Sequence, residues 1–466
     1  MLSQAPGRAT IRIALISHAS VVIETADAVI WSDPWLSGTA FNDSWGLLPE
    51  PPPGLADAWL PRVTHLYISH EHPDHFHVPS LRALPEPFRR RVVLVFQELH
   101  TDRMTAAFRR LGFANVLTLR HRERRQIAPE TTLYLYQAAP LDSALAVIGD
   151  RTVLNVNDAE LCPYDLRTIR ADLGKIDTVL NQFSFATYDG REDYPRVARA
   201  EARRVLESVA GDHVALGARQ TIPFASLMYF CAEDNRHLNA YGNRMRDVHA
   251  ALAERGLGVL VLRPGDVCDL GAPWSNEAPL AYYDALDPAT RPVRPASPVA
   301  IDTLLEAGNA LLRDLHRAHH GALLRAVGTF VIHVPDLGAT LEMAVGRRRL
   351  RRLEGARPDW DIRVNSQPLR FAFETTYGMQ TLSISGRFWL RKKHRRFMLL
   401  RVLAALRNAE IYLRPRHLLE PAFRRFAWRS RTRLRHQVLG WLGILGTFVP
   451  GSRPDARRGA EDAPQP

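Results

Sequence analysis

The stretch YISHEHPDHFH, residues 67–77, restricts the fold of this chain most, because it gathers four histidines and two acidic residues within eleven positions. It directly follows the apolar residues of THLYIS (64–69), so a buried strand is expected to lead into it. Alternating residues of an extended turn point the same way, so His70 and His72 are expected to converge on one ion, while Asp74 and His75 serve a second. Imidazole and carboxylate together favour zinc, iron or manganese over calcium and magnesium.

Strands and helices alternate through the first half of the chain. Residues 11–31 alternate apolar and polar side chains around TADA, which predicts a hairpin. Residues 32–54 are rich in Pro, Gly and Asp, which predicts a long loop of the kind that carries function. Further strands are predicted at 64–69, 91–96, 132–137, 145–149, 152–157 and 178–183, and helices at 98–112 and 194–211. This interleaving predicts an α/β layered domain.

The chain has 466 residues, too many for one ordinary core, so two domains and a tail are expected. The first domain is predicted at 1–275, followed by a Pro-rich linker at 276–298. Helical and strand-like segments at 299–400 predict a smaller α+β domain. Residues 401–466 are predicted as a basic amphipathic helical tail with a disordered end.

The pattern His70-x-His72-x-Asp74-His75 after a strand resembles the hallmark of the metallo-β-lactamase superfamily, and the resemblance covers roughly residues 10–270. It implies an αββα sandwich. It also implies that Asp158, at the end of TVLNVND, bridges two metal ions, and that Asp33 of the Asp-Pro-Trp turn lies near them. His18 follows the first strand, where the superfamily often has Gly-His-Ala beside the metal pocket; either a supporting role there or ordinary packing is expected.

Residues 32–52 and 222–230 resemble the branch of the superfamily that contains CMP-N-acetylneuraminate hydroxylase. Members of that branch are iron oxygenases that take electrons from a Rieske cluster. Such a cluster needs two Cys and two His in paired motifs, and the three widely spaced cysteines of this chain do not provide them. The resemblance therefore implies a separate electron-transfer protein.

The sequence departs from the superfamily at two ligand positions. No histidine lies between His121 and His213, so the third imidazole of hydrolytic members is absent, and Asp142 is the nearest substitute. Lactonase-like members end a late strand with Ile-Pro-Met-His, whereas this chain has Ala225 in the last position. His237, Glu233 or Asp234 of the following loop is expected to replace that ligand; otherwise His237 is a surface residue or supports the ligands from behind.

These residues predict a metalloenzyme with two divalent ions, zinc or iron, with manganese as a further candidate. The first expectation is a hydrolase that uses metal-activated water, oriented by Asp74, on an ester, amide, lactone or phosphodiester. The alternatives are an iron-dependent oxygenase and a non-catalytic binding protein with a degenerate site. Tyr188 and Asp189 are expected to line the substrate pocket, and His77 is expected on the loop surface.

The C-terminal part is basic, with 16 Lys or Arg against two acids between residues 387 and 435. Arginine clusters alternate there with aromatic and aliphatic residues through 387–450. This favours an anionic membrane surface over nucleic acid, and a solvated helix and a partner interface remain as further interpretations. The preceding domain weakly resembles sterol-carrier-type domains, which implies a small or lipid-like ligand. Cysteine usage and the absence of an export signal predict a cytoplasmic protein, with peripheral membrane contact through the tail.

Overall fold

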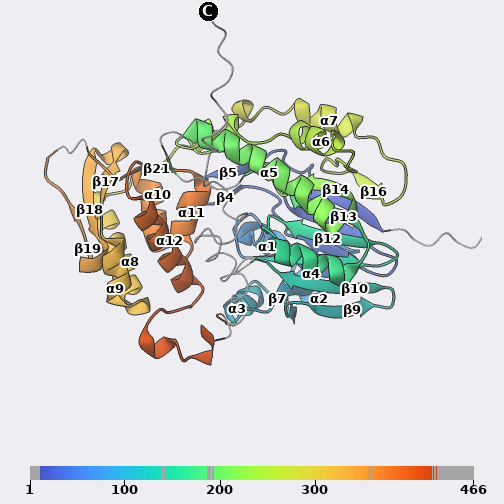
Figure 1. Cartoon of the computed structure of the whole chain (residues 1–466), viewed down its shortest axis with the longest axis horizontal. Helices are drawn as coiled ribbons and strands as arrows, with labels where there is room; N and C mark the ends of the chain where they lie inside the picture. The colour runs from blue at the N-terminus through green and yellow to red at the C-terminus, as the bar shows by residue number, and fades with distance from the viewer. Residues whose placement is uncertain are drawn as a thin grey trace, which may run out of the picture.

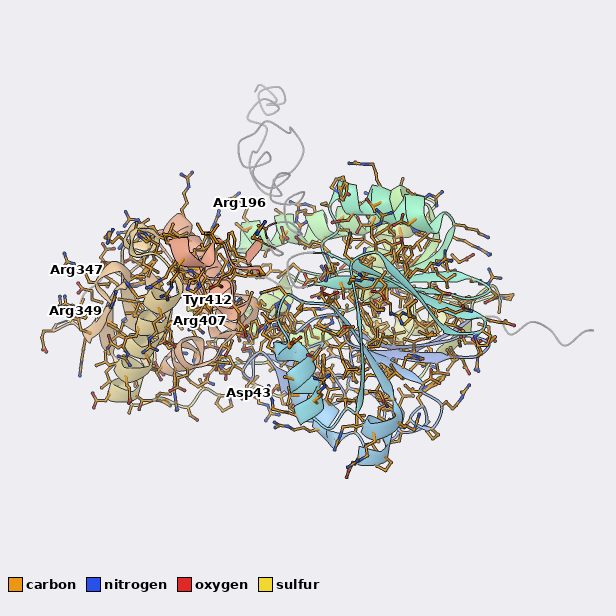
Figure 2. The ribbon with its side chains drawn as sticks, turned by 90° about the horizontal axis from the view of Figure 1, so that it is seen from below. Asp43, Arg196, Arg347, Arg349, Arg407 and Tyr412 are labelled. Atoms are coloured by element: carbon orange, nitrogen blue, oxygen red, sulfur yellow. The ribbon has the colours of Figure 1, made fainter. Side chains whose placement is uncertain are left out.

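The computed structural model describes residues 11–138, 142–185, 190–191, 194–355, 359–421, 423–424 and 427. Two lobes are visible in Figure 1, the larger one running from blue to yellow-green and the smaller one from yellow to red. Figure 2 shows the same two lobes from below, with Asp43 labelled on the larger lobe and Arg347 and Arg349 on the smaller.

The first sheet of the larger lobe has the strand order β16-β1-β2-β3-β6-β7-β8. These strands are β1 (Arg12–Ser17), β2 (Ser20–Glu24), β3 (Val29–Ser32), β6 (His65–Tyr67), β7 (Val93–Gln97), β8 (Asn115–Leu119) and β16 (Val267–Asp269). Strands β3, β6, β7 and β8 run parallel, so their carboxyl ends lie at one edge of the sheet. Helices α1 (Val78–Ala83), α2 (Glu86–Arg91) and α3 (Arg103–Arg110) bring Leu81, Phe88 and Phe108 into a buried cluster with Trp31 and Leu66 of this sheet.

The second sheet has the order β14-β13-β12-β11-β10-β9. These strands are β9 (Glu123–Ala128), β10 (Thr131–Gln137), β11 (Ser143–Ile148), β12 (Thr152–Asn157), β13 (Ile176–Gln182) and β14 (Ala218–Phe224). Helices α4 (Pro163–Leu173) and α5 (Tyr194–Leu216) pack along it. Leu166 and Ile169 of α4 pack with Val156 in one buried cluster.

A shared core joins the two sheets. Leu15 and Ile23 from the first sheet and Leu145 and Leu180 from the second are all 2% exposed or less and belong to one cluster. Because helices cover the outer faces and the sheets cover each other, most strand residues are buried on both sides. The predicted αββα sandwich is confirmed.

The segment predicted as a linker is partly helical. Helix α7 (Glu277–Asp284) begins in it, next to α6 (Met245–Ala253), and Tyr283 Oη donates a hydrogen bond of 2.7 Å to Leu262 O. Its buried side chains, Leu280 and Tyr283, attach it to the first domain, which Pro content alone did not indicate. The long loop after β3 also carries short strands: β4 (Thr39–Ala40) and β5 (Trp45–Leu47) form a small sheet with β15 (Met228–Phe230).

The smaller lobe is an α+β domain around a sheet of order β19-β18-β17-β20-β21. Its strands are β17 (Thr329–Val334), β18 (Ala339–Ala344), β19 (Arg349–Arg352), β20 (Ile362–Val364) and β21 (Phe388–Leu390). Its helices are α8 (Ile301–Ala318), α9 (Gly321–Val327), α10 (Ser366–Glu374), α11 (Gly378–Ser385) and α12 (His394–Asn408). Helix α12 crosses residue 400 and buries Phe397, Leu400 and Leu403, so its first turns belong to this domain's core. None of the described helices is both long enough and apolar enough to cross a membrane.

Candidate metal centre

The loop after β6 forms the centre of the site. Ile68 N donates to Val95 O, which continues the pairing with β7 up to the first candidate ligand. The chain then turns, because His72 O accepts from His75 N at 3.0 Å and from Phe76 N at 2.7 Å. This turn brings Asp74 and His75 back beside His70. The prediction that His77 lies on the loop surface is wrong. Its side chain is 2% exposed, and its Nδ1 accepts from Ser80 N and caps α1.

Two imidazoles and one carboxylate form a first group of candidate ligands, His70, His72 and Asp158. His70 Nε2 lies 2.7 Å from His72 Nδ1, so both lone pairs can face one small volume. Asp158 follows β12, whose last residue, Asn157, has φ +60°, and its Oδ2 lies 3.7 Å from His70 Nε2.

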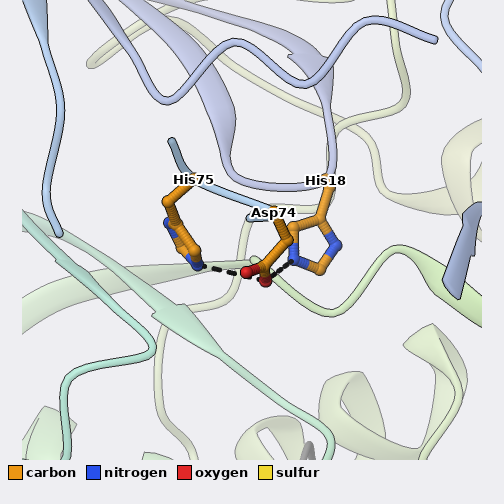
Figure 3. A group of neighbouring side chains, drawn as sticks. All are labelled: His18, Asp74 and His75. Carbon is orange, nitrogen blue, oxygen red and sulfur yellow. Dashed lines mark hydrogen bonds and ion pairs between the residues drawn. The ribbon is translucent and has the colours of Figure 1, made fainter. Parts of the chain in front are cut away.

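A second group has the same composition, with His18, Asp74 and His75 (Figure 3). The Asp74 carboxylate lies between the two rings: its Oδ2 is 3.2 Å from His18 Nε2 and 3.3 Å from His75 Nε2. His18 comes from the turn between β1 and β2, 56 residues earlier in the chain. All three side chains are buried.

Asp158 also faces the second group. Its Oδ1 lies 3.4 Å from His75 Nε2, while its Oδ2 faces His70 of the first group. One carboxylate therefore has an oxygen turned to each group, as a bridge between two cations requires.

Asp33 supports the site from behind. Its carboxylate accepts from Ser69 N at 2.8 Å and from Ser69 Oγ at 2.7 Å, and its Oδ2 lies 2.9 Å from His75 Nδ1. A carboxylate on the far nitrogen of an imidazole fixes the tautomer that leaves the other nitrogen free for a metal. The position predicted for Asp33 near the candidate ligands therefore agrees with this geometry.

The residues fit a bound cation. Asp74 Oδ1, His75 Nε2 and Asp158 Oδ1 are buried, and the contacts among these three side chains, at 3.3 Å or more, do not reach hydrogen-bond geometry. Buried polar atoms without a hydrogen bond are costly, and here they belong to groups that ligate transition metals. The second group and Asp158 thus present acceptor atoms that a divalent ion would satisfy.

The electrostatics of the site favour charged carboxylates. Burial alone raises the pKa of Asp74, but the neighbouring His75 and His18 lower it well below its usual range. Burial likewise opposes ionisation of Asp158, and His75 and His70 lower the pKa of its carboxyl. Burial, followed by the charge of His70, lowers the pKa of His72, which favours the neutral ring that a metal needs.

Other predicted site residues lie elsewhere. Asp142 precedes β11, and its charge partly opposes the lowering of the His72 pKa, but it belongs to neither ligand group. His237 stacks on Trp389 of the second domain with ring centroids 5.2 Å apart, and it also lies outside both groups. Tyr188 and Asp189 lie outside the described residues. Metal binding by Asp142 or His237, and a place in the substrate pocket for Tyr188 and Asp189, stay predictions.

Sequence reasoning did not assign His18 as a ligand candidate. Ala225, the position where a late histidine was expected, donates its N–H to His18 O at 2.8 Å. The His18 backbone therefore lies beside the position that lacks an imidazole. The only sequence signal was the place of His18 after the first strand, and that did not reveal its contact with Asp74.

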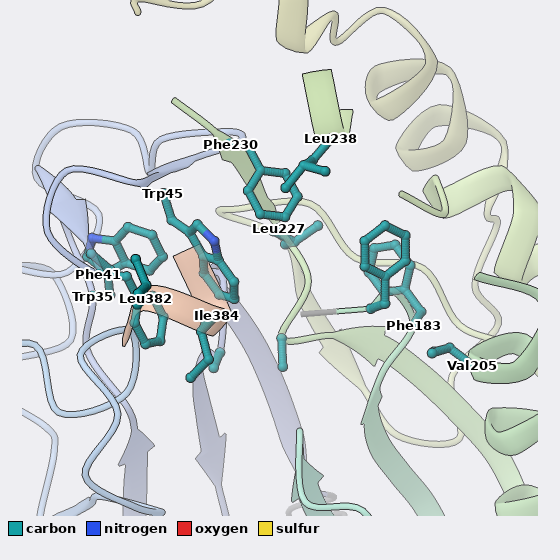
Figure 4. Close-up of a cluster of buried hydrophobic side chains, with 14 of the residues drawn as sticks. Trp35, Phe41, Trp45, Phe183, Val205, Leu227, Phe230, Leu238, Leu382 and Ile384 are labelled. Carbon is teal, nitrogen blue, oxygen red and sulfur yellow. The ribbon is translucent and has the colours of Figure 1, made fainter. Parts of the chain in front are cut away.

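An aromatic wall joins the second group to the second domain. Trp35 and Trp45 lie 5.4 and 6.3 Å from the His18 ring, centroid to centroid. Figure 4 shows Leu382 and Ile384 of α11 next to this wall. These two side chains and the two tryptophans belong to one buried cluster. Nearby, the buried Arg387 donates from Nε to Asp234 Oδ1 at 2.7 Å. The second domain therefore packs directly against the residues that surround the site.

Comparison with protein families gives one match, to the model described as a Beta-lactamase superfamily domain, over residues 12–156. Among curated proteins, one of Mycobacterium tuberculosis that carries the name Rieske 2Fe-2S iron-sulfur protein is 30% identical over 248 residues, which are 50% of this chain and 47% of that protein. The chain thus spans about half the length of this relative.

Two further similarities are shorter or weaker. The cytidine monophosphate-N-acetylneuraminic acid hydroxylase of Asterias rubens is 40% identical over 79 residues, which are 16% of this chain and 12% of the hydroxylase. The solved structure of CmlA, a diiron β-hydroxylase from Streptomyces venezuelae, is 17% identical and has a TM-score of 0.42, covering 57% of this chain and 55% of CmlA.

Proposed function

The N-terminal domain of this chain belongs to the metallo-β-lactamase superfamily, and from that premise we propose that the chain is a binuclear, iron-dependent oxygenase. The observation that carries the proposal is the composition of the two ligand groups. Each combines two imidazoles with one carboxylate, the set typical of non-haem iron oxygenases. A zinc hydrolase with its full set of histidines would be richer in imidazole.

The relatives support the same choice. The names of two similar proteins refer to a hydroxylase and to an iron–sulfur protein. When bound, two iron ions would supply the activation of dioxygen and the redox chemistry for hydroxylation.

The residues of the chain have separate tasks in this proposal. His70 and His72 with Asp158 would hold one ion. His18, Asp74 and His75 would hold the other, and Asp158 faces both groups. Asp33 keeps His75 in the tautomer that binds metal. Trp35 and Trp45, both 2% exposed or less, exclude bulk water from this side of the centre.

The electrons would come from another protein. The three cysteines in the described residues are free, and two of them, Cys231 and Cys268, are buried. They provide no paired thiolates for a Rieske cluster. We therefore propose a separate electron donor, and a small-molecule or lipid-like substrate.

Metal analysis tests the proposal. Chain purified without added metal and without oxygen is expected to contain close to two iron ions, measured by plasma mass spectrometry, and an oxygen-sensitive iron spectrum. His72→Ala should lose at least one of them, whereas His237→Ala, which removes an imidazole outside both groups, should keep two. Stoichiometric zinc in the native protein, with no iron, would refute the oxygenase.

A hydrolase is the second candidate, because Asp158 has one oxygen turned to each ligand group. That arrangement suits two-metal hydrolysis, in which a metal-activated water attacks an ester or phosphodiester. Zinc at two ions per chain, with turnover of a chromogenic ester or phosphodiester that His72→Ala abolishes, would favour it over the oxygenase.

A further inference from the structure

An open cleft of about 780 Å³ lies between the two domains, behind the metal-binding loop. Its walls come from α3 and the loop after β6 on one side, and from α8, the α10–α11 turn and the segment after α12 on the other. Figure 2 labels Arg407 and Tyr412, which lie side by side on the second domain where it faces the first.

Positive charge dominates the cleft. Five arginines line it: Arg103, Arg110, Arg317, Arg407 and Arg416. Three acidic residues face them: Glu71, Asp314 and Glu410. The excess of two positive charges matches the charge of a phosphate monoester, about −1.5 to −2 at pH 7.

Arg407 is partly buried and yet has no carboxylate of the described residues in close contact, unlike Arg103, which pairs with Glu71. Its side chain is 18% exposed, and its nearest carboxylate oxygen, Asp314 Oδ2, is 4.0 Å from Nη1. That carboxylate already accepts from Arg317 at 3.0 Å through its other oxygen. Arg407 Nη2 also donates to the Asn408 side-chain oxygen, at 3.1 Å. Burial lowers the pKa of Arg407, as expected for a guanidinium short of negative charge.

Aromatic rings complete the walls. Tyr412 lies beside Arg407, and Tyr377 lies under the Arg103 guanidinium, 5.3 Å from carbon Cζ to ring centroid. Phe76 lines the side nearest the metal loop. Rings beside arginines suit a ligand that joins an anion to a flat or apolar group.

We propose that this cleft binds a phosphate monoester carried on an aromatic or acyl group. Arg407 is its inner cation, and the exposed Arg110 and Arg416 hold it at the rim. Planar guanidinium groups suit the bidentate binding of phosphate oxygens.

The cleft is distinct from the metal centre, although the two are neighbours. Glu71 stands between His70 and His72 in sequence, but its carboxylate pairs with Arg103 at the wall of the cleft. A ligand in the cleft therefore contacts the back of the metal loop and none of the ligand groups. Anion binding in the cleft is therefore expected whichever metal is bound and whichever reaction the metal centre performs.

Calorimetric titration of the full chain with phenyl phosphate tests the inference, with phenol as the uncharged comparison. Phenyl phosphate should bind with an affinity that falls as salt is raised, and phenol should not bind. Arg407→Gln should weaken binding at least tenfold. Arg395→Gln removes an exposed arginine of the same helix outside the cleft and should change it less than twofold. Equal binding by both variants, or no binding by the native chain at 10 mM ligand, would overturn the proposal.

Two further measurements keep the result unambiguous. His72→Ala should bind phenyl phosphate as the native chain does, and loss of binding there would place the anion at the metal centre instead. If Arg407→Gln does not fold, the double variant Arg110→Gln with Arg416→Gln, at two exposed positions, should weaken binding by the same order. Titration with dihexanoyl phosphatidic acid distinguishes the sources: tighter binding than phenyl phosphate indicates a lipid headgroup, and weaker binding a soluble monoester.

Discussion

A single histidine shows how a binuclear site can survive the loss of a ligand. The expected imidazole at residue 225 is an alanine, yet the His18 backbone is hydrogen bonded to that alanine and the His18 ring contacts Asp74. The second ion can therefore be held by an imidazole from the first hairpin instead of from the late strand. What matters for the chemistry is the position of a nitrogen in space, not the strand that supplies it.

We predict that His18→Ala binds about one metal ion per chain instead of two, and that adding Ala225→His restores the second. The rescue is expected because the backbone of residue 225 is hydrogen bonded to the backbone of residue 18, so a histidine side chain at 225 lies close to the place of the lost ring. Metal content after gel filtration, and competition with a chromophoric chelator, measure both variants.

The control separates ligation from positioning. His18→Gln keeps an amide that can donate to Asp74 but provides no imidazole, so it should also lose one ion. Two ions in His18→Gln would mean that His18 only orients Asp74. His65→Ala, at a buried histidine outside both ligand groups, should keep two ions.

At the scale of elements, helix α5 buries an acid that nothing at the metal centre explains. Asp212 is 8% exposed, and burial raises the pKa of its carboxyl to about 7, although Asn181 Nδ2 donates to it at 3.0 Å. Between these two pKa values the Asp212 carboxyl is protonated in the folded chain and ionised in the unfolded chain, where its pKa is about 3.9. The stability that this group contributes is present below about pH 4 and is lost as the pH rises to about 7.

Asp212→Asn is accordingly predicted to stabilise the chain at pH 8 by about 1–3 kcal/mol, and to have little effect near pH 4. The amide mimics the protonated acid and still accepts from Asn181. Urea unfolding at both pH values measures the difference. Glu207→Gln, at an exposed position of the same helix, should show no such pH dependence, and a pH-independent effect of Asp212→Asn would contradict the assignment.

The elements that sequence predicted correctly are those whose signal is local. Alternation marked β1 and β2, and apolar runs marked β6 and β12, because burial on two faces requires such runs. Helix α7 was missed because the prolines of this segment indicated a linker, whereas its buried residues Pro279, Leu280 and Tyr283 find partners only after folding. The strands β4, β5 and β15 were missed for the same reason, since two or three residues carry no periodicity.

The candidate site divides in the same way. The spacing of His70, His72, Asp74 and His75 is contained within one loop, so its convergence could be inferred from the sequence. The contact of His18 with Asp74, the stacking of His237 on Trp389 and the pairing of Glu71 with Arg103 all join segments that are distant in the chain. No periodicity or propensity encodes such contacts, because packing of whole elements decides them.

At the scale of the whole molecule, the described part of the basic C-terminal region has one buried and one exposed apolar face. Helix α12 anchors Phe397, Leu400 and Leu403 in the second domain, so removing the chain from residue 400 would damage that core. On the outer side of the same helix, Met398 and Val402 are 49% and 45% exposed, and Leu419 farther on is 81% exposed. Exposed apolar residues among arginines are typical of a surface that meets anionic lipid.

We therefore predict that the chain binds vesicles containing phosphatidylserine but not neutral vesicles, and that truncation after Glu420 reduces the bound fraction by more than half while the domains stay folded. The reason is that truncation removes six of the 16 basic residues between 387 and 435 without touching α12. Co-sedimentation at two salt concentrations measures the bound fraction, and binding should fall at the higher concentration.

Replacing Met398 and Val402 with Ser in the full chain should also weaken vesicle binding if this face of α12 contacts the bilayer. Equal sedimentation of the full and truncated chains would refute the membrane role, and preferential binding to an oligonucleotide over vesicles would assign the basic residues to nucleic acid.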